Sequence, residues 1–169
     1  MSPAQNGVII MASSVHLEEM TSAECIAFLS RMSFGHLACI DHDRPYVVPI
    51  HFVFHEGGVY SFSMLGAKIE NMRLNPHVCL QVDEVKNTST WTSVILHGLY
   101  QELEDNEQWQ SERIYAWSLI QKLPNWWEPG GSTIHPHETG TDSTKPIFFS
   151  IQKESLTGRK AVQREDFVR

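Results

Sequence analysis

At 169 residues, the chain is long enough for one domain with a single buried core. Its formal net charge of −7 argues against a nucleic-acid partner, because binding a phosphate backbone requires a basic surface. Its apolar runs are shorter than the roughly 20 residues that span a bilayer, and its first residues lack the pattern of a signal peptide. We therefore expect a cytoplasmic protein with no nucleic-acid partner and no membrane partner.

The cysteines and histidines do not form a recognisable metal site. The three cysteines are an odd number without CxxC spacing, which is typical of core residues in a reducing compartment. His51 and His55 lie in a predicted strand, where side chains four residues apart are too distant to share a metal ion. His135 and His137 lie in a predicted loop without cysteine or carboxylate at zinc spacing. We expect neither a disulfide framework nor a bound metal.

The first predicted element is a short amphipathic helix after a flexible lead-in over residues 1–15. Thr21 is a good N-cap residue, and Glu24 three positions later completes a capping box. Met20 and Cys25 are placed as a hydrophobic staple around this start. The apolar residues that follow recur at helical spacing, so one face of the helix should lie on an apolar surface.

A series of β-rich stretches follows, separated by turns rich in Asp, Gly and Pro. The predicted strands cover residues 34–40, 46–54, 59–64, 77–85, 90–103 and 147–151. A short helix over 67–75 interrupts them, and Gly98 is expected to mark a bulge or a close approach of two strands. Many strands with few helices favour a closed or half-closed barrel, because closure removes exposed edges. The predicted fold class is therefore mainly β, a β-barrel with flanking helices.

The pattern changes at residue 105. We interpret residues 105–146 as a helix and loop insertion, because Trp109 and Trp117 lie at roughly helical spacing and Pro124 ends the pattern. After the last predicted strand, residues 155–169 are interpreted as a polar tail. The sequence has no internal repeat and no second domain, so we expect a single domain over the whole chain.

The clearest candidate site lies where a predicted strand runs into the short helix. Ser61 and Ser63 alternate with apolar residues, and Gly66 allows the backbone to approach a ligand closely. Lys68 then lies near the helix N-terminus, whose free N–H groups favour an anion. A hydroxyl, a cation and amide donors together suit a phosphate group. The alternative is an ordinary turn in which Lys68 and Arg73 are solvated helix residues.

A second candidate site surrounds Pro49. Proline cannot donate to a β-ladder, so Pro49 indicates an edge strand, a bulge or an interrupted strand. One interpretation is structural and treats the segment as an edge strand. The other is functional, with the backbone groups from Val48 to His51 facing a planar polar ligand. His51 is either a residue of that site or a histidine that packs within the strand.

The order of these predicted strands, the segment around Pro49 and the helix start at Gly66 and Lys68 resembles a known family. It is similar to the FMN-binding split β-barrel of the pyridoxamine 5'-phosphate oxidase superfamily. The resemblance is strongest to the branch that includes the nitroimidazole-resistance (Nim-type) reductases. It covers residues 34–104, and more weakly the segments "IFFSI" and "LTGRKA" near the C-terminus. It implies a homodimer with two FMN molecules in clefts between the subunits.

The resemblance assigns nine residues to the flavin site. The first group borders the isoalloxazine ring (Val48, Pro49, Ile50 and His51), the second holds the phosphate (Ser63, Lys68 and Asn71), and the third approaches the flavin from the same or the partner chain (Trp91 and Ser93). His51 would orient the flavin edge or act catalytically by protonating the reduced acceptor. No metal is implied.

The function implied by the resemblance is an FMN-dependent oxidoreductase. It would pass electrons from a reduced nicotinamide donor to a small organic acceptor, such as a nitro compound or a quinone. Three alternatives remain open: a flavin carrier without turnover, a split barrel that binds haem through His51, and a deazaflavin in place of FMN. The basic residues Arg159, Lys160 and Arg164 do not match the arginines with which pyridoxamine phosphate oxidases bind their substrate. Oxidation of pyridoxamine phosphate is therefore not expected.

Overall fold

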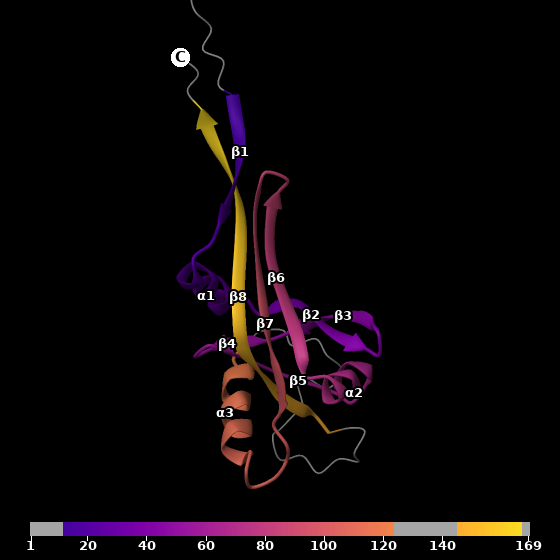
Figure 1. The fold of residues 1–169 in the computed structure, drawn as a ribbon. Helices are drawn as coiled ribbons and strands as arrows, with labels where there is room; N and C mark the ends of the chain where they lie inside the picture. The colour runs from indigo at the N-terminus through magenta and orange to yellow at the C-terminus, as the bar shows by residue number, and fades with distance from the viewer. Residues whose placement is uncertain (1–11, 124–144, 167–169) are drawn as a thin grey trace, which may run out of the picture.

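The structure is a computed structural model that describes residues 12–123 and 145–166 (Figure 1). In these residues, eight strands form one antiparallel sheet, and three helices lie around it. The strands are β1 (Ala12–Glu19), β2 (Phe34–Asp41), β3 (Arg44–His51), β4 (Val53–His55), β5 (Gly58–Ser63), β6 (His77–Asn87), β7 (Thr90–Glu102) and β8 (Ile147–Asp166). The helices are α1 (Ser22–Arg31), α2 (Ala67–Leu74) and α3 (Gln110–Ile120).

The sheet is a barrel that closes between its two edge strands. The strand order is β3-β2-β6-β7-β8-β5-β4, with β1 added to β8, so β3 and β4 lie at opposite ends of the order. Only Phe52 separates these two strands in the sequence. Its side chain is buried, and its N–H donates to the carbonyl of Ser33 at 3.0 Å. The predicted split β-barrel is confirmed, and Pro49 lies on an edge strand.

The longest strand, β8, was only partly predicted. It pairs with β5, β7 and β1, and it continues to Asp166 through residues that we interpreted as a polar tail. That interpretation was wrong because much of this segment is exposed, so it lacks a run of apolar residues. Residues 12–15 likewise belong to β1 instead of a lead-in. β1 and the end of β8 project from the barrel as a two-stranded arm (Figure 1).

The helix α1 has the predicted capping box. The backbone N–H of Glu24 donates to the hydroxyl of Thr21 at 3.3 Å, and the N–H of Thr21 donates to the Glu24 carboxylate at 2.7 Å. Cys25, Phe28 and Leu29 are buried on the inner face of the helix and belong to the barrel core. The predicted amphipathic helix is therefore confirmed.

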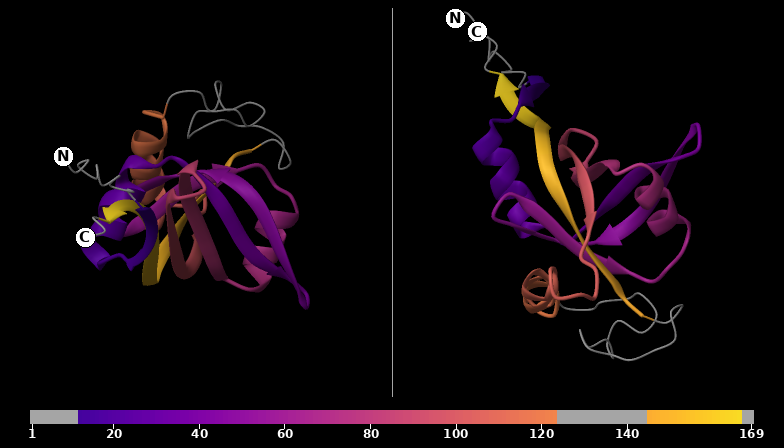
Figure 2. Two further views of the ribbon diagram at one scale, coloured as in Figure 1. Left: turned by 90° about the horizontal axis from the view of Figure 1, so that it is seen from above. Right: turned by 60° about the horizontal axis from the view of Figure 1, so that its bottom comes forward.

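A second apolar cluster lies under α3, on a different side of the sheet from α1 (Figure 2). Ala116 and Ile120 of α3 pack against Phe62, Leu103 and Phe148. β5 and β8 therefore bury side chains on both faces where α3 covers them. Within the described ranges, none of the helices is long and apolar enough to cross a membrane. The rest of the predicted insertion, with His135 and His137, lies outside the described residues.

The bulge at Gly98 leads to a test of strand packing. The register of β7 on β8 shifts between His97 and Gly98, as predicted, and a Cβ atom on Gly98 would lie 2.4 Å from the carbonyl oxygen of Gln152. Gly98→Ala should therefore lower the free energy of unfolding in urea by about 1–3 kcal/mol. Gly58→Ala is the control, because its Cβ would meet only the Tyr60 ring at 3.5 Å. Equal losses in the two variants would contradict this explanation.

Candidate functional site

The helix α2 begins at a residue that cannot cap it. Gly66 is the N-cap, and it provides no side-chain hydrogen bond to the first turn. Its carbonyl accepts from the N–H groups of Ile69 and Glu70 at 2.9 and 3.1 Å, so the helix is regular from its start. No atom lies within 4 Å of a Cβ built on Gly66. The N-terminus of α2 is thus open, and it presents N–H groups and partial positive charge.

Asn71, one turn further along α2, carries an unsatisfied donor. The residue is only 6% exposed, and its Nδ2 has no hydrogen-bond partner among the described residues. The nearby sulfur of Cys39 interacts with this amide but is only a weak acceptor. Burial raises the pKa of the Cys39 thiol, and Asn71 and Lys68 act in the opposite direction, which places both near β2. A buried donor without a strong acceptor costs about 1–3 kcal/mol, so Asn71 is a point of lowered stability in α2.

The two serines of β5 have different roles. Ser61 is 1% exposed, and its hydroxyl donates to the carbonyl of His51 at 2.6 Å, which joins β5 to the end of β3. Ser63 is 5% exposed, and its hydroxyl donates to the carbonyl of Met64 at 3.0 Å. Ser63 would have to rotate to donate to a phosphate. The sequence placed both hydroxyls at this strand end, but it did not assign Ser61 to the site.

The predicted ligand-binding residues of β3 alternate between the core and the outside. Ile50 is 1% exposed and lies in the core, so only its backbone can face a ligand. Pro49 is exposed and Val48 is half-buried. The rings of His51 and Phe34 meet edge-on, with their centroids 5.3 Å apart. The Nε2 atom of His51 is buried. Because β3 pairs only with β2, its other edge presents backbone N–H and C=O groups.

Trp91 and Ser93 lie elsewhere in the chain. They line a groove of about 540 Å³ between β7, β8 and the end of β1, together with Ile95 and Arg159. No residue of β3, β5 or α2 lines this groove. β7 is three strands from β3 in the sheet order, or roughly 14 Å at the usual strand spacing. The other seven predicted residues do not line this groove, so Trp91 and Ser93 occupy a separate place on the sheet.

An exposed apolar surface lies between β3 and the groove that Trp91 and Ser93 line on β7. In the ladders, Pro49 lies opposite His36, His36 opposite Gln81, and Gln81 opposite Ile95. This outer side of β3, β2, β6 and β7, which we call the outer β3–β7 face, exposes several large apolar side chains. They are Phe34 at 41%, Ile40 at 38%, Val47 at 57% and Ile95 at 36%.

Comparison with known proteins identifies the family. A family model described as pyridoxamine 5'-phosphate oxidase matches residues 21–160, which include every element from α1 through most of β8. The chain belongs to this family. The family predicted from the sequence is therefore confirmed. A relative, an uncharacterised protein of Rhizobium meliloti (strain 1021), is 42% identical over 146 residues, which cover 86% of this chain and 96% of the relative.

Solved structures also resemble this pyridoxamine 5'-phosphate oxidase family member. A structure described as a FAD-binding protein from Mesorhizobium loti is 38% identical, with a TM-score of 0.71, and the match covers 86% of this chain and 99% of the other. A putative 5-nitroimidazole antibiotic resistance protein from Bacteroides thetaiotaomicron is 15% identical, with a TM-score of 0.65, covering 98% and 99% of the two chains. At that identity, the second structure shows a shared fold alone.

No group of three or more His, Cys, Asp or Glu side chains in residues 12–123 and 145–166 is arranged to hold a metal ion.

The unsatisfied amide of Asn71 predicts an unusual effect on stability. Asn71→Leu should leave the free energy of unfolding of the ligand-free protein unchanged or raise it, because it removes a buried donor without a partner. The same variant should bind FMN more weakly.

Asn75→Leu, at the C-cap of the same helix, is the contrast, because the Asn75 Oδ1 accepts from the N–H of His77 at 3.1 Å. It should lower the free energy of unfolding by about 1 kcal/mol and leave FMN binding unchanged. Urea denaturation and flavin fluorescence titration measure both effects, and a similar loss of stability in both variants would contradict the prediction.

Proposed function

We propose that this protein binds a flavin nucleotide, with the ribityl phosphate at the N-terminus of α2. The observation that carries this proposal is the open helix start at Gly66, followed by Lys68 in the first turn and the unsatisfied amide of Asn71. A phosphate there would accept hydrogen bonds from backbone amides and compensate the partial charge of the helix. Family membership and the 38% identical structure described as FAD-binding support a flavin over other phosphate compounds.

The edge of β3 supports the same ligand. Backbone N–H and C=O groups from Val48 to His51 are suited to the polar edge of an isoalloxazine ring, as the resemblance implied. The hydroxyl of Ser61 fixes the carbonyl of His51, so this edge is held in place before a ligand binds. FMN and FAD both carry the phosphate that the site requires. We propose FMN, and mass spectrometry of the cofactor released by heat distinguishes it from FAD and from a deazaflavin.

We further propose that the protein is an oxidoreductase that uses a reduced nicotinamide and a small organic acceptor. The flavin supplies the electron chemistry when bound, and the protein supplies binding and orientation. The packing of His51 on Phe34 and its buried Nε2 favour an orienting role over proton donation. Anaerobic addition of NADH or NADPH should bleach the flavin absorbance, and a nitro compound or a quinone should restore it. A flavin that stays oxidised would instead support a carrier without turnover.

We also propose a homodimer that completes the site. The outer β3–β7 face exposes large apolar side chains that a partner would cover. The groove of Trp91 and Ser93 is separate from the phosphate site of its own chain. In a dimer with two shared clefts, the groove of one protomer would face the α2 helix of its partner. Such a dimer would bring Trp91 and Ser93 of one protomer to the predicted phosphate site of its partner.

The phosphate site is tested with two flavins that differ only in the phosphate. Lys68→Ala should weaken FMN binding by about 1.5–3 kcal/mol, because a charge-assisted hydrogen bond is lost. Riboflavin binding should change little. Lys153→Ala removes an exposed lysine of β8 and should change neither affinity. If Lys68→Ala weakens both flavins equally, Lys68 does not contact the phosphate.

The dimer is tested on the outer β3–β7 face. Val47 is 57% exposed on β3, and Val47→Glu should convert the dimer into a monomer, because it would place charge in an apolar interface. Ile114 is 47% exposed on α3, outside this face, and Ile114→Glu is the matched control that should stay dimeric. Sedimentation velocity at micromolar concentration measures both. A wild-type monomer with bound flavin would disprove the shared clefts.

A further inference from the structure

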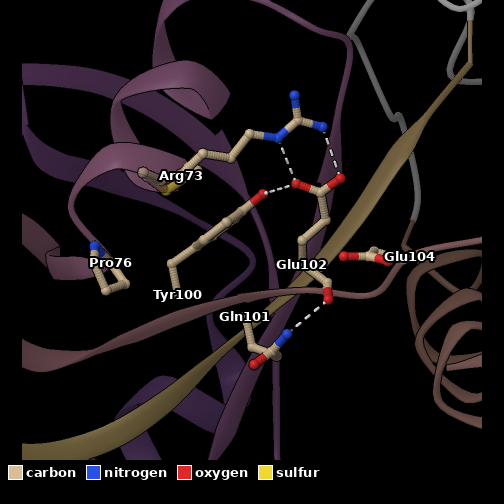
Figure 3. A pocket seen from close by; sticks show the side chains of 7 residues that line it. Arg73, Pro76, Tyr100, Gln101, Glu102 and Glu104 are labelled. Atoms are coloured by element: carbon tan, nitrogen blue, oxygen red, sulfur yellow. Dashed lines mark hydrogen bonds and ion pairs between the residues drawn. The ribbon is translucent and has the colours of Figure 1, made fainter. Parts of the chain in front are cut away.

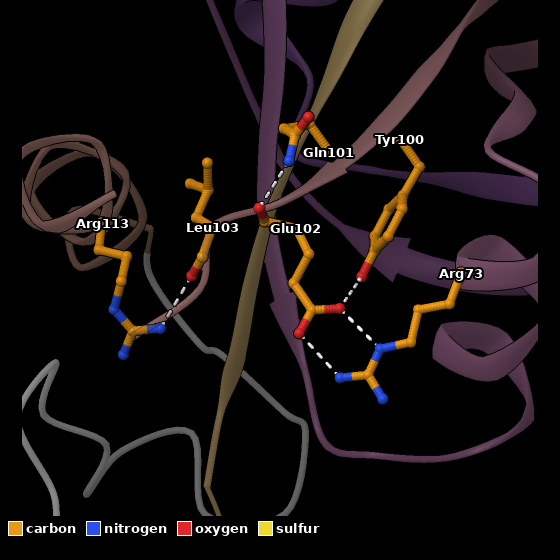
Figure 4. A network of polar contacts seen from close by, with 6 residues as sticks. All are labelled: Arg73, Tyr100, Gln101, Glu102, Leu103 and Arg113. Atoms are coloured by element: carbon orange, nitrogen blue, oxygen red, sulfur yellow. Dashed lines mark hydrogen bonds and ion pairs between the residues drawn. The ribbon is translucent and has the colours of Figure 1, made fainter. Parts of the chain in front are cut away.

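The C-terminal end of α2 is joined to β7 by a network of polar contacts (Figures 3 and 4). The Nε and Nη2 atoms of Arg73 donate to the two carboxylate oxygens of Glu102, at 2.7 and 2.8 Å. The hydroxyl of Tyr100 donates to the same carboxylate at 2.9 Å. Tyr100 is 8% exposed, and the side chain of Glu102 is 20% exposed. This is a bidentate, charge-assisted ion pair in which the Arg73 side chain is 46% exposed.

A backbone contact strengthens the same connection. The N–H of Tyr100 donates to the carbonyl of Pro76 at 2.8 Å, two residues beyond the end of α2. Arg73 lowers the pKa of the Glu102 carboxyl, and burial raises the pKa of the Tyr100 hydroxyl. Glu102 therefore stays charged and Tyr100 stays neutral at physiological pH. β7 holds both the last turn of the helix and the chain that leaves it.

The opposite end of α2 begins without a side-chain cap. Side-chain caps normally help to fix a helix start, and Gly66 provides none. Ile69 and Met72 anchor the inner face of the helix in the core, because both are fully buried. The helix has only eight residues, or about two turns. Because the helix is this short and rigid, a tilt about the buried Ile69 and Met72 at its last turn would also shift Lys68 and Asn71 in its first turns.

We propose that Arg73, Glu102 and Tyr100 form a clamp that positions the N-terminus of α2 for the flavin phosphate. The inference rests on the proposed function and adds three positioning residues to it. These residues line a separate pocket of about 620 Å³, whose lining includes neither Lys68 nor Asn71 (Figure 3). The clamp thus acts on the phosphate through the helix. The clamp holds α2 in position from its C-terminal end, so the N-terminus of the helix can stay uncapped for a ligand.

The test compares the affinities for FMN and riboflavin, measured by quenching of flavin fluorescence on ligand-free protein. Glu102→Gln keeps the shape of the side chain but loses the bidentate pair. It should weaken FMN binding about 3- to 10-fold, in the range expected for a partly exposed ion pair. Riboflavin binding should stay within about twofold, because that flavin has no phosphate to misplace. The charge swap Arg73→Glu with Glu102→Arg should recover part of the preference for FMN.

The chain contains a matched control for this experiment. Arg31, in the last turn of α1, pairs with Glu84 of β6 through two contacts of 2.9 Å. Glu84→Gln breaks a bidentate pair of the same kind at a different helix, so it should change neither flavin affinity. Thermal unfolding of both variants separates losses of stability from losses of affinity. If Glu102→Gln does not fold, Tyr100→Phe removes one contact to Glu102 and should change FMN binding in the same direction by a smaller factor.

The outcomes distinguish the clamp from the proposed function. A wild-type protein that binds neither flavin, or binds both equally, would disprove the phosphate site and the clamp with it. A wild-type preference for FMN that persists in Glu102→Gln would overturn the clamp alone. Equal weakening of both flavins in that variant would also overturn it, because the pair would then only stabilise the fold. A selective loss of FMN binding, absent in Glu84→Gln, supports the clamp.

Discussion

The closure of the barrel at Phe52 is the constraint on which the other features depend. One buried residue carries the chain from one edge of the sheet to the other, and its N–H is held by the carbonyl of Ser33. β3 is therefore an edge strand, where Pro49 costs no ladder hydrogen bond and the backbone can face a ligand. The hydroxyl of Ser61 bonds the carbonyl of His51 beside this closure. Among the described strands, β3 and β4 thus keep one unpaired edge each beside this closure.

The candidate site combines stable and unsatisfied elements. Below it, the barrel core and the ion pair between Arg73 and Glu102 fix α2 in place. At its N-terminal end, the helix has no side-chain cap, and the buried amide of Asn71 lacks a strong acceptor among the described residues. Both features cost stability in the ligand-free protein. A protein keeps such costs where a ligand recovers them, and elsewhere in the fold α1 shows that the same chain builds a complete capping box.

The sequence predicted those parts of the fold that local patterns specify. Alternation, turn residues and the capping box identified the central strands and α1, and Gly98 marked the bulge. The extension of β8 was missed because its partners, and not its own composition, make it a strand. In the site, the burial of Ile50 follows from alternation along β3. Arg73 and Glu102 are 29 residues apart in the sequence. Local sequence patterns cannot predict a contact between residues so far apart in the chain.

The position of β8 in the chain has a consequence for biosynthesis. β8 follows every other strand in the sequence, yet it lies between β7 and β5 in the sheet and also pairs with β1. Until it emerges from the ribosome, the β4–β5 hairpin has no ladder to the rest of the sheet. The nascent chain must therefore carry unpaired strand edges through most of its synthesis, a state prone to aggregation. Pairing of the β4–β5 hairpin with the rest of the sheet is therefore a late step of folding.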